Sequence, residues 1–118
     1  MEKNEISSLQ KYIWLDQKIN PHSPKYNIGG YAIINSCIDF KLFKKAVSLF
    51  ARKHTGIKNV FQQDGGIPFS FIHKEDTYEG IHCFEENNKQ KLIDLIRRDF
   101  KVPFNIENHK RLFKIWLV

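Results

Sequence analysis

The stretch at residues 7–30, SSLQKYIWLDQKINPHSPKYNIGG, constrains the possible folds most strongly. Ser7 and Gln10 have the spacing of a capping box, in which two side chains satisfy free backbone amides at a helix start. Pro21 and Pro24 then end the helix and stiffen the loop, because proline lacks a backbone N–H and has a fixed φ. The stretch therefore predicts a helix, a stiff loop and the start of a strand.

Composition places the chain among globular proteins. It has 118 residues, enough for one domain, and is 42% hydrophobic and 27% charged. No apolar run approaches the roughly 20 residues that span a bilayer, and no signal peptide opens the sequence. We therefore expect a cytoplasmic protein without membrane contact, in which Cys37 and Cys83 are partly buried thiols and form no disulfide.

The net charge of +6 raises the question of nucleic-acid binding. The basic residues are mostly lysine, whereas base and phosphate recognition favours the arginine fork, so we expect no nucleic-acid partner. An acidic protein partner remains open. A metal site is not expected, because the histidines are scattered at His22, His54, His73, His82 and His109.

Further elements follow from periodicity and turn residues. The predicted helix caps are Asp39 and either Asn87 or Asn88. The sequence Asp64-Gly65-Gly66 predicts a hairpin turn, and Pro68 predicts that its strand lies at a sheet edge. The predicted strands lie at residues 31–35, 57–63, 67–72, 81–84 and 111–118, and the predicted helices after the first at 40–54 and 89–101. This order indicates an α/β or α+β fold, with helices packed on a mixed sheet.

The helix faces give three further expectations. The second helix carries an apolar face that includes Phe43 and Phe50, opposite a solvated lysine face. We expect Trp14 of the first helix to pack in the core beside that apolar face. In the third helix, Asp94 has the spacing to pair with Arg98 one turn later.

The opening stretch resembles the start of nonribosomal peptide synthetase condensation domains. These begin with a Ser-x-Ala-Gln-x-Arg-Leu-Trp-like motif, an Asp-Gln pair, a Pro-x-Ser-Pro loop and a Tyr-Asn-Ile strand. Leu9 and Tyr12 replace the alanine and arginine of the first motif. The matching residues are Ser7, Gln10, Ile13, Trp14, Asp16, Gln17, Pro21, Ser23, Pro24, Tyr26, Asn27 and Ile28.

Two later segments extend the resemblance over residues 7–118. The family's Arg-His-Glu-x-Leu-Arg-Thr-x-Phe motif is similar to residues 53–61, where Thr55 and Asn59 depart from it. His54, Ile57 and Phe61 match this motif, and Lys53 and Lys58 keep its charge. Pro103-Phe104-Asn105-Ile106 and Arg111-Leu112-Phe113-Lys114 resemble the family's Phe-Asp-Leu…Pro-Leu-x-Arg segment.

The resemblance implies that residues 1–118 are the N-terminal lobe of a condensation domain, half of a chloramphenicol-acetyltransferase-like fold. The family's active-site motif, His-His-x-x-x-Asp-Gly, would follow the last strand, and it is not present in these residues. We therefore assign no catalytic, cofactor-binding or metal-binding residue. His54 is expected to be structural, and Asp64-Gly65 to be a hairpin turn rather than the catalytic Asp-Gly.

Two hypotheses of different classes remain. In the first, the parent domain joins a carrier-bound acyl thioester to a carrier-bound amine, and its partners are the second lobe and carrier proteins with phosphopantetheine arms. In the second, the chain is a freestanding module that binds a carrier protein or dimerises without catalysis. The apolar end at Val118 favours the first and suggests self-association through the last strand. The gene beyond Val118 distinguishes them, whereas donor and acceptor specificity, subtype and oligomeric state stay open.

Overall fold

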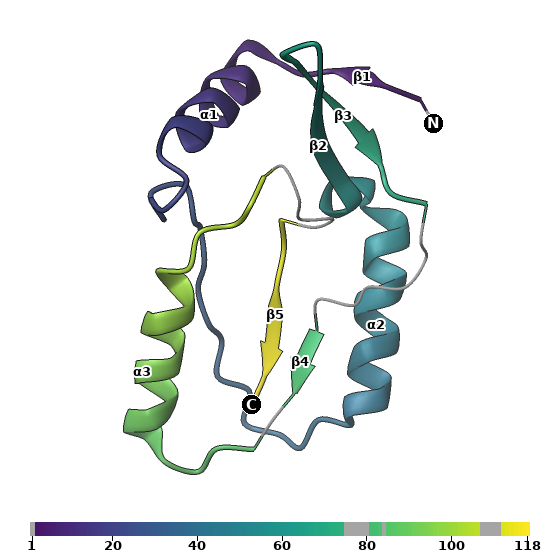
Figure 1. Ribbon diagram of the computed structural model, residues 1–118. Helices are drawn as coiled ribbons and strands as arrows, with labels where there is room; N and C mark the ends of the chain where they lie inside the picture. Colours follow the sequence, from purple (N-terminus) through teal and green to yellow (C-terminus); the bar gives the residue numbers. More distant parts are fainter. Residues whose placement is uncertain (1, 75–80, 84, 107–111) are drawn as a thin grey trace.

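The computed structural model describes residues 2–74, 81–83, 85–106 and 112–118. Figure 1 shows helices arranged around two small sheets, which confirms the predicted α+β class. The elements in chain order are β1 (Asn4–Glu5), α1 (Ser8–Ile19), α2 (Phe40–Lys53), the 3₁₀ helix η1 (Thr55–Lys58), β2 (Asn59–Asp64), β3 (Ile67–Ile72), β4 (Ile81–Cys83), α3 (Lys89–Phe100) and β5 (Ile115–Leu117).

The strands fall into two sheets rather than one. An antiparallel sheet has the order β1-β3-β2, and β4 pairs with β5 in a parallel two-stranded sheet. In Figure 1, β4 and β5 lie between α3 and α2, while α1 lies beside the hairpin formed by β2 and β3. The helices therefore frame the parallel pair on two sides.

The predicted caps are confirmed. The Ser7 hydroxyl accepts from the Gln10 amide at 3.2 Å, and the Gln10 side chain accepts from the Ser7 amide at 2.8 Å. Asp39 accepts from the Leu42 amide at 2.9 Å, and Asn88 is the cap of α3. These short polar side chains satisfy donors that helix starts leave unpaired.

The hairpin is confirmed, and the strand before it begins later than predicted. Gly65 and Gly66 have φ of 54° and 84°, so the turn uses the left-handed region at both central positions. Residue 64 pairs with residue 67 directly across this turn. The 3₁₀ helix Thr55–Lys58 occupies the two positions, 57 and 58, where we expected the strand to start.

The edge position predicted for β3 is wrong. This strand is central, because the two-residue strand β1 pairs along its other side. The β1 ladder covers only Ser70 and Phe69, so it stops directly before Pro68. Pro68 has no N–H with which to extend this ladder by a third pair. Proline therefore limits the length of the β1–β3 ladder here, and it does not place β3 at the edge of the sheet.

The strand predicted at residues 31–35 is not formed. These residues are exposed, and none of them belongs to a ladder among the described residues. The sequence has β propensity, but propensity yields a strand only where a neighbouring strand pairs with it. We call residues 28–37, all of which are exposed, the exposed segment.

The C-terminal half follows the prediction with shorter elements. Helix α3 ends at Phe100, strand β4 covers Ile81–Cys83, and β5 covers Ile115–Leu117. Phe84, His109 and Arg111 lie outside the described residues. In α3, Asp94 accepts a hydrogen bond from Gln90 one turn earlier at 3.0 Å.

Few of the described side chains are deeply buried. The buried apolar residues are Ile6, Trp14, Val47, Ala51, Val60 and Phe71. The radius of gyration is 16.2 Å, against about 13 Å for a compact domain of roughly 100 residues. The fold is therefore open, with large apolar side chains at its surface.

Trp14 is buried as expected, but its predicted neighbours are wrong. The cluster around α2 consists of Val47 and Ala51, and the partly buried side chains packed on it are Phe43, Ile57, Ile81 and Ile115. Phe50 is half-exposed, and α1 lies apart from α2 in Figure 1. The amphipathic pattern identified the buried side of each helix but not the element that covers it.

The two cysteines differ from the prediction in one respect. Cys37 and Cys83 are free, and both are exposed rather than partly buried. Within the described residues, every helix is too short or too polar to cross a bilayer.

Candidate functional site

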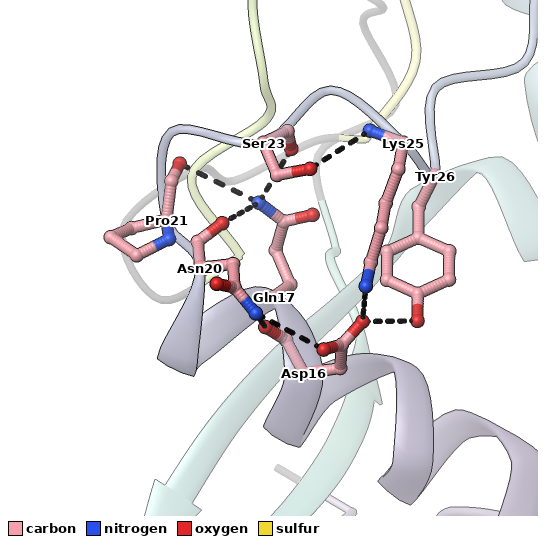
Figure 2. A network of polar contacts seen from close by, with 7 residues as sticks. All are labelled: Asp16, Gln17, Asn20, Pro21, Ser23, Lys25 and Tyr26. Carbon is pink, nitrogen blue, oxygen red and sulfur yellow. Dashed lines mark hydrogen bonds and ion pairs between the residues drawn. The ribbon is translucent and has the colours of Figure 1, made fainter.

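The motif residues after α1 form a polar network that closes the proline-bounded loop (Figure 2). Asp16 lies at its centre. The Tyr26 hydroxyl donates to Asp16 Oδ2 at 2.5 Å, and Lys25 forms an ion pair with the same oxygen. Asn20 Nδ2 donates to Asp16 Oδ1 at 3.2 Å. Both carboxylate oxygens are therefore occupied by donors from the loop.

These contacts shift three pKa values in the directions expected for an ionised carboxylate among donors. Hydrogen bonding from Lys25, and then from Tyr26, lowers the pKa of Asp16. The same bond to Asp16 raises the pKa of Lys25, and the bond from the phenol raises the pKa of Tyr26. All three groups thus keep their ordinary charge at neutral pH, and none is prepared for proton transfer.

Gln17 closes the loop from inside. Its side chain is 6% exposed, and Nε2 donates to the carbonyl oxygens of Asn20 at 3.1 Å and Ser23 at 3.0 Å. The Pro21 carbonyl lies farther away, at 3.5 Å. An amide with two hydrogens thus gathers three loop carbonyls, and burial excludes the water that would otherwise solvate them.

Asn27 connects the end of this loop to the end of α3. Its Nδ2 lies 2.8 Å from both the Phe100 and Val102 carbonyl oxygens. Helix ends leave carbonyls unpaired, and Asn27 satisfies them from a distant part of the chain. A Cβ built on Gly29 would lie 3.1 Å from the Phe100 ring, so the backbone of the exposed segment also passes close to α3.

The network explains the opening motif as structure rather than chemistry. It contains an acid, an amine, a phenol and amides, but none of these groups is a general base or nucleophile directed at open space. Asp16 faces its own loop, and Gln17 is buried. The arrangement fixes the path of the chain from α1 to α3.

The other candidates also have structural surroundings. The His54 amide caps α2 by donating to the Phe50 carbonyl at 2.8 Å, and the rings of these two residues lie 4.4 Å apart. Asp64 binds Lys3 at 2.7 Å beside the hairpin turn, which lowers its pKa. Both positions therefore support the structural roles expected of His54 and Asp64.

One cluster was missed by the sequence analysis. Asp99 accepts from Trp116 Nε1 at 2.9 Å and from Lys114 at 3.2 Å, and the Trp116 ring stacks on His82 at 4.6 Å. These contacts fasten α3 to β5 and β5 to β4. No local spacing signals them, because the partners lie far apart in the chain.

The part of the chain that the structure describes gives little evidence for a metal or ligand site. No group of three or more His, Cys, Asp or Glu side chains gathers there. A surface hollow of about 450 Å³ lies near the start of β1 and the end of β3. It is lined by Glu2, Asn4, Lys58, Ile72, His73 and Lys74, so no pair of acids or histidine set lines it.

The sequence of residues 2–118 matches the family described as the condensation domain. The chain belongs to the condensation domain family. This match covers nearly every residue, including the loop network and both framing helices, so the motif resemblance and the family assignment agree.

Curated relatives are very long proteins of which the chain spans a small part. It is 27% identical over 106 residues to polyketide synthase PksN from Bacillus subtilis, covering 89% of this chain and 2% of that protein. Tyrocidine synthase 3 from Brevibacillus parabrevis is 26% identical over 101 residues, covering 86% of this chain and 2% of that protein.

Solved condensation domains share the fold. The starter condensation domain of rhizomide synthetase RzmA has a TM-score of 0.86 at 21% identity, covering 98% of this chain and 28% of that chain. The first condensation domain of the calcium-dependent antibiotic synthetase has a TM-score of 0.77 at 18% identity, covering 91% of this chain and 27% of that chain. The 118 residues thus correspond to part of a condensation domain.

Proposed function

We propose that residues 1–118 form the N-terminal lobe of a condensation domain, ending before its His-His-x-x-x-Asp-Gly motif. The observation that carries this proposal is the family match over residues 2–118, together with the TM-score of 0.86 over 28% of the RzmA starter domain. The open shape adds support, because exposed apolar side chains are expected where a further lobe packs.

In this proposal the parent domain forms a peptide bond between two carrier-bound substrates. The amine attacks the acyl thioester, the C–N bond forms as the C–S bond breaks, and the carrier thiol leaves. A histidine outside these residues orients or deprotonates the amine. Tyrocidine synthase and gramicidin synthase relatives support this class of reaction.

The partners follow from this reaction. They are the second lobe and peptidyl or aminoacyl carrier proteins, whose phosphopantetheine arms bring the thioester and the amine. The chain itself holds no cofactor in this scheme. A cytoplasmic location fits the free thiols Cys37 and Cys83, since a reducing compartment keeps cysteines unpaired.

The chain alone is then expected to be inactive. Holding two reactants in place supplies roughly 7–11 kcal/mol, and a general base contributes roughly 10²–10⁴-fold in rate. A single lobe without the paired histidines loses most of both contributions. Two of the described histidines support this expectation, because His54 packs on Phe50 and His82 stacks on Trp116.

The test is amide formation between two loaded carrier domains. It compares the 118-residue chain, a longer chain that includes the histidine motif, and the complete two-lobe domain. We expect turnover only from the two-lobe domain. Turnover by the 118-residue chain above the uncatalysed rate would overturn the proposal and direct attention back to the scattered histidines.

The gene sequence after Val118 distinguishes a freestanding module from the N-terminal lobe of a longer domain. A stop codon directly after Val118 favours a small carrier-binding or dimerising protein, whereas an in-frame His-His-x-x-x-Asp-Gly supports the N-terminal lobe. The lysine face of α2 supports an acidic partner in either case, because Lys41, Lys44 and Lys45 are all exposed.

A further inference from the structure

Helix α2 carries apolar side chains on the side that faces away from the core. Leu42, Ala46 and Leu49 have the spacing of one helix face, and we call them the α2 seam. All three are exposed, Leu42 to 66% and Leu49 to 53%. The core residues Val47 and Ala51 lie on the other side of the helix. Figure 1 accordingly shows α2 at the outer edge of the molecule, with β4 and β5 on its inner side.

A row of cations runs along one flank of the α2 seam. Lys41, Lys45 and Arg52 are exposed, and their spacing places them side by side along about 16 Å of helix. We call these three residues the basic strip. Every ion pair within the described part of the chain involves other side chains. The positive charges of the basic strip are therefore available to a partner.

The basic strip opposes the local stability of its own helix. Helix α2 contains five Lys or Arg residues and no Asp or Glu. Lys41 lies in the first turn, where the positive end of the helix dipole disfavours a cation, and Lys45 repels it from one turn away. A sequence that departs from local preference is expected where the surface has a binding role. The α2 seam and the basic strip are therefore treated as one binding surface.

We propose that this surface docks an acidic amphipathic helix of another protein or domain. Leucines seven residues apart with charged side chains beside them are the arrangement by which paired helices select their partners. The apolar side chains of the partner cover the α2 seam, and its Asp or Glu side chains neutralise the basic strip. This surface serves the N-terminal lobe and the freestanding module equally, so the inference goes beyond the proposed function.

Other occupants match this surface less well. Nucleic-acid phosphates neutralise the basic strip but leave the leucines of the α2 seam uncovered. A membrane surface takes up a helix with a broad apolar face, whereas the α2 seam is three residues long and narrow. A second copy of the chain presents the same positive charges, and two such surfaces repel each other.

The experiment measures binding of a synthetic helical peptide to the complete protein by fluorescence anisotropy. The peptide has ~15 residues, with glutamates at the spacing of the basic strip and leucines at the spacing of the α2 seam. A second peptide has the same composition in scrambled order. We expect the ordered peptide to bind at least about tenfold more tightly than the scrambled one, and added salt to weaken its binding.

Two pairs of substitutions locate the binding surface. Combining Lys41→Gln with Lys45→Gln is expected to weaken peptide binding by more than about tenfold, because it removes charges that the glutamates contact. The control combines Lys89→Gln with Lys91→Gln on α3, which removes the same charge from exposed positions and should change affinity by less than about twofold. The urea midpoint of the α2 variant should not fall, because the substitutions relieve repulsion within the helix.

Charge reversal provides a further measurement. Lys41→Glu combined with Lys45→Glu is expected to abolish binding of the acidic peptide and to create binding of a peptide in which lysines replace the glutamates. Equal affinity for ordered and scrambled peptides, or an equal loss in the α3 control, would reduce the attraction to general charge and overturn the inference. A peptide that fails to bind also overturns it. If a DNA duplex or phosphatidylglycerol vesicles bind through the basic strip instead, that occupant replaces the helix. The carrier assay decides the proposed function separately.

Discussion

Asn27 Nδ2 lies 2.8 Å from the carbonyl oxygen of Phe100, a residue 73 positions later in the chain. The same nitrogen donates to the Val102 carbonyl at 2.8 Å. The start of the exposed segment and the end of α3 are therefore joined by one side chain. An ordinary Asn in the opening motif acts as a long-range connector.

We expect Asn27→Ala to destabilise the chain by about 1–2 kcal/mol, since each lost hydrogen bond contributes roughly 0.5–1.5 kcal/mol. The measurement is the urea midpoint. Asn35→Ala is the matched control, because Asn35 is exposed. Equal midpoints for the two variants would show that the Asn27 contacts add no stability.

Gln17→Ala is expected to cost about 1–3 kcal/mol, because it removes the donor that the loop carbonyls share and leaves those carbonyls partly buried. Gln62→Ala is the control, since Gln62 is an exposed glutamine in β2. Exchange of the amides at residues 20–25 locates the effect. Unchanged exchange there, with Gln17→Ala as stable as the control, would contradict the closing role of Gln17.

The Asp16 network gives a pH dependence of known sign. Asp16 has a lowered pKa in the folded chain, so its stabilising contribution is present above the unfolded carboxyl pKa and is lost as pH falls through the folded value. Lys25 and Tyr26 have raised pKa values, so their contributions are present below their unfolded pKa values and are lost as pH rises through the folded ones. We expect stability to decline at both extremes.

The measurement for this network is the urea midpoint from acid to alkaline pH. Asp16→Asn is expected to reduce the decline on both sides, because it removes the charge that both partners contact. A control, Asp94→Asn, should leave the alkaline side unchanged, since Asp94 lies on α3 and bonds Gln90. An alkaline profile of Asp16→Asn identical to that of the unmodified chain would refute the assignment.

Trp14→Ala is expected to cost about 3–5 kcal/mol, because the side chain is 7% exposed and its removal leaves a cavity. Trp14→Phe should cost much less, since Trp14 Nε1 is buried without a hydrogen-bond partner in the described structure. Leu9→Ala, at a 68% exposed position on the same helix, is the control. An unchanged denaturant midpoint in Trp14→Ala would refute the burial.

We predict that the chain self-associates through its C-terminal strand, β5. Trp116 and Val118 are 39% and 48% exposed, and β5 pairs only with β4 among the described strands. An apolar edge of this kind associates with another. We expect sedimentation at high concentration to detect oligomers, and Val118→Asp to reduce them. A monomer at every concentration would count against the prediction.

Local chemistry made part of the fold predictable. The capping box at Ser7 and Gln10 and the Asp64-Gly65-Gly66 turn each depend on neighbours within a few residues, and both are present as predicted. The central place of β3 was missed because it depends on β1, two residues with no strand pattern. Local pattern fixes element type, whereas sheet order depends on distant partners.

The candidate site was also predictable only in part from the sequence. The motif residues Asp16, Gln17 and Asn27 were identified by their resemblance to a family motif, but sequence alone did not give their roles. Those roles come from contacts with loop carbonyls and with the end of α3. The Asp99 cluster had no motif at all, since it forms only when α3 and β5 meet.

The short ladder at β1 has a practical consequence for the amino terminus. Pairing stops before Pro68, and the two β1 residues are themselves exposed, so Ile6, at 2% exposure, is the buried anchor of this end. An end held by two ladder pairs, one buried side chain and the exposed Lys3–Asp64 ion pair is expected to open more readily than a long ladder. Proteases that cut transiently opened chain are therefore expected to trim this terminus first when Ile6 is shortened to alanine, while the hairpin behind it stays intact.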